Sequence, residues 1–251
     1  MITNDARLKI ILLKFYVLYI TYHLLKLYKS ILVYVPDGLD VSLSSLKTLH
    51  LLSVKYENKE SQRSLLRGCP VLEELVVDKS DSLRVESFAV KVPSLERLSV
   101  LYQFDDDLDG LDEHSEHEFY NDRVTINAPS LKYLNYVDIV DYGHSCVSWD
   151  MPELEEAHVK LVCKRPEKLM RSLTAVKRLS LCLFNHSMVQ HRVALCQLVH
   201  LELCGCSPKW WDLLTWILKS SPKLQVLKLN KCSEECYCSV KPIGRPWGLV
   251  M

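Results

Sequence analysis

Glycine is scarce in this sequence, with seven residues among 251. The sequence has no Gly-rich phosphate-binding loop, no GxSxG motif of hydrolases and no HExxH motif of zinc proteases. Its His and Cys residues form no pair in a context typical of nucleophilic catalysis. We therefore expect no enzymatic activity and no cofactor.

A dominant charge is also lacking. Lys and Arg total 31, as do Asp and Glu, so the formal net charge is zero. Such a chain has no overall field that would attract nucleic acid or an anionic membrane. We therefore expect no nucleic acid among its partners, which local surfaces must select. The 48% of hydrophobic residues is sufficient for a buried core.

A long uninterrupted apolar segment is the third absence. Residues 8–27 are about as long as a bilayer-spanning helix, but Lys14, His23 and Lys26 interrupt them. Because a Lys at mid-bilayer costs a few kcal/mol, we expect a buried element of a soluble fold here and no membrane anchor. No cleavage pattern of a secretory signal follows the basic start, which favours a reducing compartment, the cytoplasm or the nucleus.

Cysteine is present in ten copies, several of them within apolar stretches. Examples are Cys182 in LSLCLF and Cys204 in HLELCGC, where we expect small buried thiols. The cysteines from Cys204 to Cys238 fit no zinc-ribbon spacing, because their pairs are separated by one or three residues. We interpret them as buried and surface thiols and expect no metal site.

A repeated phrase organises the chain. An apolar residue is followed three and five positions later by two more, often with Pro two positions before the first. The first positions are Tyr22, Leu46, Leu72, Leu95, Leu131, Leu154, Val176, Leu198 and Leu224. Steps between them are 22 to 26 residues, except for one of 36 residues after Leu95. Leucine-rich repeats have periods of 20 to 29 residues, so we predict an α/β fold, a leucine-rich-repeat solenoid.

The phrase also predicts how such a solenoid is built. Its last two apolar residues are two apart, so on a short strand they face the same way, into the core. We expect parallel strands to form a curved sheet with a concave face. The convex side is expected to be irregular, with strands or irregular chain in the middle. Short helices are predicted there in ESQRSLLRG, which would stop at Gly68, in RPEKLMRSLT and in PKWWDLLTWILKSSP.

Three segments are predicted from this pattern. Residues 1–20 form an apolar N-terminal segment, and residues 21–232 form the leucine-rich-repeat domain. The domain includes an acidic inter-repeat loop at 104–118, and residues 233–251 form a C-terminal tail.

The phrases SSLKTLHL, LLRGCPVLEELVV and SPKLQVLKL, together with the pair Trp210 and Trp211, resemble plant F-box/LRR/FBD-type proteins. The resemblance runs from about Thr21 to Cys232. It implies a substrate-recognition subunit, in which an N-terminal F-box docks a Skp-type adaptor of a cullin-type ubiquitin ligase and the repeats select the target. Since we find no F-box pattern before Thr21 and no complete FBD region after Lys231, we expect target recognition without adaptor binding.

Side chains that point outward from the predicted strands are the candidates for partner contact. They mix both charge signs with aromatic groups and hydroxyls and form no basic stripe, which suits a protein ligand better than a nucleic acid. The candidate residues are His50, Arg97, Tyr133, Asn135, His158, Arg178, His200, Glu202 and Lys228. We predict a non-catalytic protein-interaction module with an unidentified protein target.

The stretch DDDLDGLDEHSE, residues 105–116, matches the expression for a calcium loop. Its candidate ligands would be Asp105, Asp107, Asp109 and Glu116. Asp112 occupies the position where a calcium loop has an apolar residue, and the stretch falls within the single 36-residue step. We interpret it as an exposed inter-repeat loop. The alternatives are a calcium- or metal-binding protein that uses this loop, and a truncated, non-functional family member.

Overall fold

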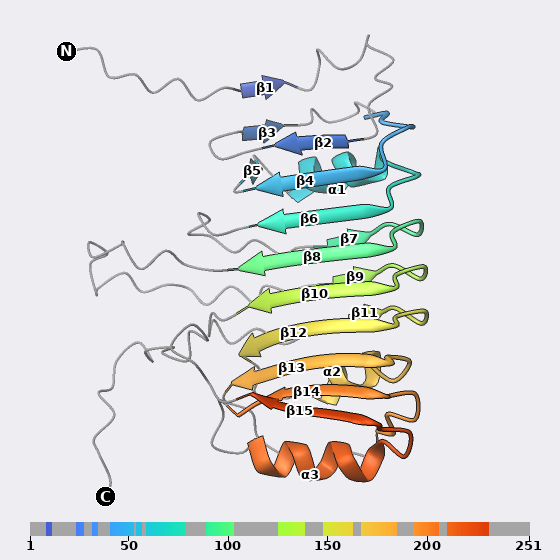
Figure 1. Cartoon of the computed structure of the whole chain (residues 1–251). Helices are drawn as coiled ribbons and strands as arrows, with labels where there is room; N and C mark the ends of the chain where they lie inside the picture. The colour runs from blue at the N-terminus through green and yellow to red at the C-terminus, as the bar shows by residue number, and fades with distance from the viewer. Residues whose placement is uncertain are drawn as a thin grey trace, which may run out of the picture.

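A nine-stranded parallel sheet runs along the molecule (Figure 1). The computed structural model describes residues 9–11, 24–27, 32–34, 41–52, 54–56, 59–78, 89–102, 125–138, 148–162, 167–184, 193–205 and 210–230. The nine strands are β2 (Leu24–Leu27), β4 (Thr48–Leu52), β6 (Glu74–Asp78), β8 (Arg97–Tyr102), β10 (Tyr133–Asp138), β12 (Glu156–Val162), β13 (Arg178–Phe184), β14 (His200–Cys204) and β15 (Val226–Asn230). They lie side by side in the order of the sequence, one strand for each repeated phrase.

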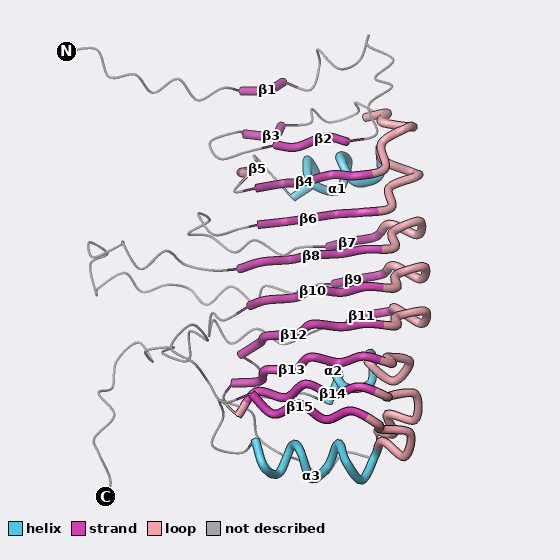
Figure 2. Tube along the Cα trace, in the orientation of Figure 1, coloured by secondary structure: helices cyan, strands magenta, loops and turns pink. Residues whose placement is uncertain are grey.

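A tight turn precedes eight of these strands. In each turn the backbone N–H of the phrase's first apolar residue donates to the carbonyl oxygen three residues earlier, at 3.0 to 3.3 Å. Five turns have Pro in the second position, where its fixed φ suits a β-turn and its missing N–H is not needed. Figure 2 shows the turns together along one edge of the sheet. The recurrent Pro is therefore explained by the local backbone.

The inner face of the sheet carries two continuous rows of apolar side chains. The register aligns Leu49, Leu75, Leu98, Leu134, Ala157, Leu179 and Leu201 in one row, and all are at most 1% exposed. The second row runs two residues further along and includes Leu51, Val77, Val100, Tyr136, Val159, Leu181 and Leu203. These rows form the core, so the predicted leucine-rich-repeat fold is confirmed.

Helices back the two ends of the described sheet. They are α1 (Lys59–Arg67), α2 (Glu167–Ser172) and α3 (Trp210–Ser220), which are the three helices that the sequence predicts. The apolar side of α1 buries Leu65 and Leu66, and α3 buries Leu213, Leu214 and Ile217. Leu169 and Met170 of α2 are buried as well, so all three helices contribute apolar side chains to the core.

Short strands replace helices in the middle of the backing layer. The strands β7 (Ala89–Lys91), β9 (Thr125–Asn127) and β11 (Ser148–Asp150) form a three-stranded parallel sheet. Trp149 of β11 packs on the inward-facing Tyr136 of β10, with ring centroids 5.0 Å apart. Nearer the N-terminus, β1 (Lys9–Ile11), β3 (Leu32–Tyr34) and β5 (Lys55–Tyr56) form a second such sheet. The expectation of an irregular convex side is confirmed.

The long step between two repeats leaves the large sheet unbroken. Although 36 residues separate Leu95 from Leu131, β8 and β10 pair directly along six residues each. The extra residues of this step, including the predicted acidic loop 104–118, lie outside the described residues. The proposed boundaries at residues 20 and 233 lie outside them as well and stay predictions.

The last strand differs from the others in burial. Leu227 and Leu229 of β15 continue the two inner rows, but their exposed fractions are 41% and 49%. Nearby on the chain, Trp211 and Leu218 of α3 are also exposed, at 61% and 44%. The described core is therefore open at the β15 end.

Candidate interaction face

The outer side of the nine-stranded sheet, called here the open face, corresponds to the concave face of the sequence analysis. Its first row consists of Leu24, Thr48, Glu74, Arg97, Tyr133, Glu156, Arg178, His200 and Val226. Its second row consists of Lys26, His50, Val76, Ser99, Asn135, His158, Ser180, Glu202 and Lys228. All of these residues are half-buried or exposed. The structure thus places all nine sequence-predicted candidates on one face.

A chain of aromatic and charged contacts crosses the middle of the open face. The guanidinium of Arg97 lies 4.6 Å from the ring centroid of Tyr133, within the range of a cation–π contact. The Tyr133 ring in turn meets the imidazole of His158, with centroids 5.7 Å apart. Three of the predicted residues, from β8, β10 and β12, therefore touch in series.

Glu156 connects this series to the next strand. Its Oε1 lies 3.0 Å from Nε2 of His158, and its Oε2 accepts hydrogen bonds from Nε and a terminal nitrogen of Arg178, at 2.9 and 2.6 Å. The hydrogen bond with His158, followed by the one from Arg178, lowers the pKa of Glu156. The carboxylate is therefore held in its charged form between two partners.

His50 is set apart from this series. Its Nε2 lies 4.0 Å from Oε1 of Glu74, which is too far for a hydrogen bond. The same nitrogen is buried and has no hydrogen-bond partner among the described residues. The structure therefore does not bring His50 together with the candidates from β8 to β13.

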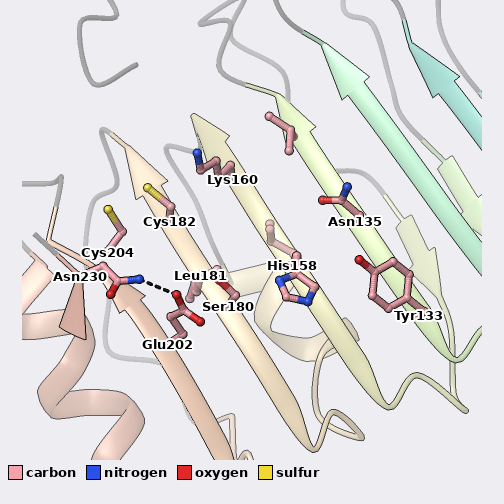
Figure 3. Close-up of a pocket in the computed structure, with 12 residues that line it drawn as sticks. Tyr133, Asn135, His158, Lys160, Ser180, Leu181, Cys182, Glu202, Cys204 and Asn230 are labelled. Atoms are coloured by element: carbon pink, nitrogen blue, oxygen red, sulfur yellow. Dashed lines mark hydrogen bonds between the residues drawn. The ribbon is translucent and has the colours of Figure 1, made fainter. Parts of the chain in front are cut away.

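A hollow of about 510 Å³ lies on the open face toward the carboxyl ends of β10 to β15 (Figure 3). It brings together four of the predicted residues, Tyr133, Asn135, His158 and Glu202. The remaining lining residues are Val137, Val159, Lys160, Ser180, Leu181, Cys182, Cys204 and Asn230. His200 and Lys228 lie on the same face but outside this lining.

Sequence reasoning missed Lys160 and Asn230 as candidates. Both lie one step beyond the second row, where Lys160 pairs in register with Val137 and Cys182, and Asn230 with Cys204. Side chains alternate between the two faces of a strand, so the residue two positions after each second-row residue also lies on the open face, and this rule would have identified both. The repeated phrase ends before these positions, so it carries no signal for them.

The cysteines of the hollow differ from each other. Cys182 is 4% exposed, as expected for a small buried side chain. Cys204 is disulfide-bonded, and its partner lies outside the described residues. The expectation of a buried thiol at Cys204 was therefore wrong, because this residue ends β14 in a half-buried position on the open face.

The alternative metal ligands Asp105, Asp107, Asp109 and Glu116 lie outside the described residues, so that alternative stays a prediction. Within the described ranges, no group of three or more His, Cys, Asp or Glu side chains is placed to hold a metal ion. None of the described helices combines the length and apolarity needed to cross a membrane.

The sequence is similar to a known repeat family and to several plant proteins. The leucine-rich-repeat family matches residues 45–70. An FBD-associated F-box protein of Arabidopsis thaliana is 48% identical over 227 residues, which are 89% of this chain and 49% of that protein. An F-box/FBD/LRR-repeat protein of the same plant is 44% identical over 76% of this chain and 43% of its own length. A second protein of this kind from the same plant is 42% identical over 89% of this chain and 50% of its own length.

The chain thus spans about half the length of the curated relatives that it matches. Their similarity confirms the resemblance that the repeated phrases and the Trp pair indicated. No solved structure gives a significant match.

Proposed function

We propose that this chain, which is homologous to plant F-box/FBD/LRR-repeat proteins, is a non-catalytic module for protein recognition. In this proposal the repeats select a target protein, as substrate-recognition repeats of a cullin-type ubiquitin ligase would. The relatives' names combine the F-box with leucine-rich repeats, which supports a role in protein interaction.

The observation that carries the proposal is the contact series on the open face. Arg97, Tyr133, His158, Glu156 and Arg178 join four neighbouring strands through stacking and hydrogen bonds. Aromatic and Arg side chains dominate the energetics of protein interfaces. Here their contacts with each other fix their positions before a partner arrives, which reduces the entropy lost on binding.

The charge pattern of this face supports a protein partner. Arg97, Arg178 and Lys160 alternate with Glu74, Glu156 and Glu202 across β6 to β14. A nucleic-acid site needs a basic stripe along which phosphates can bind, and this alternation does not provide one. A partner surface with mixed charge complements it better.

Affinity capture from plant extract tests the proposal. The purified chain is the bait, and a triple variant with Tyr133→Ala, His158→Ala and Arg178→Ala is compared with it. The matched control is Arg63→Ala, which removes an exposed Arg from α1 on the opposite layer. We expect at least one protein to be recovered with the wild type and the control and to be lost with the triple variant.

Thermal unfolding shows whether the triple variant is still folded. These side chains are half-buried or exposed, so we expect its melting temperature to stay within a few degrees of the wild type. If a folded triple variant captures the same proteins as the wild type, the open face is not the recognition surface.

Binding to the ligase adaptor is a separate question. We propose that these 251 residues alone do not bind a Skp-type adaptor, because their sequence has no F-box pattern. A pull-down with purified adaptor and purified chain tests this. Saturable direct binding would show that the chain contains an adaptor site.

A further inference from the structure

The hollow on the open face has a positive and a negative side (Figure 3). Lys160 belongs to β12 and Glu202 to β14, and β13 lies between these strands. Ser180 and Cys182 of β13 line the hollow between the two charged groups. A ligand that crosses the hollow would therefore meet an ammonium group on one side and a carboxylate on the other.

Neither charge is neutralised within the described part of the chain. Lys160 has no ion pair or side-chain hydrogen bond there, and Glu202 accepts a hydrogen bond only from the neutral amide of Asn230. Glu156 provides the contrast, because Arg178 on the next strand already pairs with it. The open face thus satisfies one of its carboxylates internally and leaves Lys160 and Glu202 available to a partner.

Two smaller polar groups in the same hollow are also available. The side chains of Asn135 and Ser180 have no hydrogen-bond partner among the described residues, although both line the hollow. An amide and a hydroxyl can each donate and accept, so they can bind the N–H and C=O groups of a peptide backbone. The hollow therefore offers contacts for a main chain as well as for charged side chains.

The sheet geometry sets the distance between the charged groups. Strands lie about 4.8 Å apart and residues rise about 3.3 Å along each, so the α-carbons of Lys160 and Glu202 are separated by roughly 12 Å. An extended peptide directs every second side chain to the same side, so residues four apart are about 13 Å apart and face the same way. Residues two or six apart would be too close together or too far apart.

We propose that the hollow binds an extended segment of the partner protein that carries one acidic and one basic side chain four residues apart. The acidic side chain pairs with Lys160, and the basic side chain pairs with Glu202. Ser180 binds the backbone between them, and Asn135, on β10 beyond Lys160, binds the backbone that continues past the acidic side chain. This inference rests on the proposed function, because it names the chemistry that the recognition face selects.

A peptide-display selection tests the inference. A random 12-residue library is panned on the immobilised wild-type chain and on two charge-reversal variants, Lys160→Glu and Glu202→Lys. An Arg63→Glu variant is the matched control, because it reverses an exposed charge on α1, in the opposite layer and away from the open face. Thermal unfolding is used to establish that all four proteins are folded.

We expect the wild type and the Arg63→Glu control to enrich peptides with an acidic and a basic residue four apart, at least threefold over the unselected library. Lys160→Glu makes both sides of the hollow negative and should enrich two basic residues at this spacing. Glu202→Lys makes both sides positive and should enrich two acidic residues. Opposite shifts in the two variants would support the assignment of each charged side.

Other outcomes would overturn the inference. If all four proteins enrich the same charge pattern, the two residues do not select the ligand, and if none enriches any peptide, the hollow does not bind extended segments. If the enriched peptides carry no charge pattern, this inference is wrong and the proposed function stays in place. The capture experiment with the triple variant decides the proposed function independently.

Discussion

At Gly68 a neighbouring repeat comes too close for any side chain. A β-carbon built there would lie 2.5 Å from the carbonyl oxygen of Val41 and 2.8 Å from its Cγ1. Gly68 directly follows the last residue of α1, as the sequence predicts, but its backbone does not adopt the left-handed conformation that often ends helices with Gly. Here Gly is required by the close packing of two repeats.

We expect Gly68→Ala to lower the free energy of unfolding by about 1–3 kcal/mol, because the backbone carbonyl of Val41 must shift. Gly205→Ala is the matched control, since its added β-carbon would meet its nearest neighbour at an ordinary 3.7 Å. The control should change the free energy by less than about 0.5 kcal/mol. Urea unfolding measures both, and equal effects of the two changes would contradict the packing explanation.

Glu156 allows a test of the contact series in solution. The pKa of Glu156 is lower in the folded protein than the ordinary Glu pKa of about 4.3, which applies to the unfolded chain. The charged carboxylate therefore stabilises the fold at pH values above about 4.3, and this contribution is lost as the pH falls through the lowered pKa. We expect both His158→Ala and Arg178→Ala to raise the pKa of Glu156, the former by more, because the hydrogen bond with His158 is the larger cause.

Carbon-13 NMR of the Glu carboxyl groups between about pH 2 and pH 7 measures these shifts. Glu155 serves as the internal reference for His158→Ala, because its own lowered pKa is caused chiefly by Lys177 and should not move. An unchanged pKa of Glu156 in both variants would mean that the series does not form in solution.

At the scale of the element, burial along one row falls sharply between the last two strands. Leu203 on β14 is 1% exposed, whereas its register partner Leu229 on β15 is 49% exposed. We expect Leu203→Ala to cost about 2–5 kcal/mol of unfolding free energy, because it leaves a cavity in a closed core. Leu229→Ala should cost about 1 kcal/mol or less, because half of its surface already meets solvent.

Urea unfolding of both variants, with the m-value compared, checks this expectation. A large loss of stability in Leu229→Ala would show that a further segment covers β15 in solution. The two variants together therefore also reveal whether residues beyond Asn230 pack on this strand.

The strands and their register could be predicted from the sequence, but the backing layer could be predicted only in part. The spacing of Leu46, Leu49 and Leu51 recurs because each repeat places the same turn and the same two inward residues against its neighbour. The segment around Val90 carries no such signal, because a three-residue strand is too short for a periodic pattern. It forms because it pairs with the equivalent strand β9, which pairs in turn with β11.

The candidate site could likewise be predicted from the sequence only in part. Alternation along the strands predicted that Tyr133 and His158 share a face, since this depends on the local period alone. It could not predict that Glu156 takes both His158 and Arg178 as partners, or that Lys160 has no partner among the residues that the structure describes. Those pairings depend on side-chain conformations on the two neighbouring strands β12 and β13, which no local pattern specifies.

For the whole molecule, the acidic segment between β8 and β10 should be dispensable for folding. Since the two strands pair directly, we expect a short Gly-Ser linker in place of residues 104–118 to shift the melting temperature by only a few degrees. Calcium at millimolar concentration should leave the melting temperature of the intact chain unchanged, because a ligand that binds the native state would raise it. Thermal unfolding with and without calcium measures both effects.

A rise in melting temperature with calcium that Glu116→Gln abolishes would contradict the interpretation of this segment as a loop. It would instead support the calcium-loop alternative. A linker variant that fails to fold would show that the acidic segment has a structural role.

The eight equivalent turns have a consequence for how such molecules change over evolutionary time. Each strand of the large sheet pairs only with its immediate neighbours, and each turn forms the same backbone hydrogen bond. A duplication or loss of the DNA that encodes one repeat would therefore create a junction that resembles those already present. Gene families built in this way can change the length of their open face in whole repeats, and under the proposed function each event would change the surface that a partner meets.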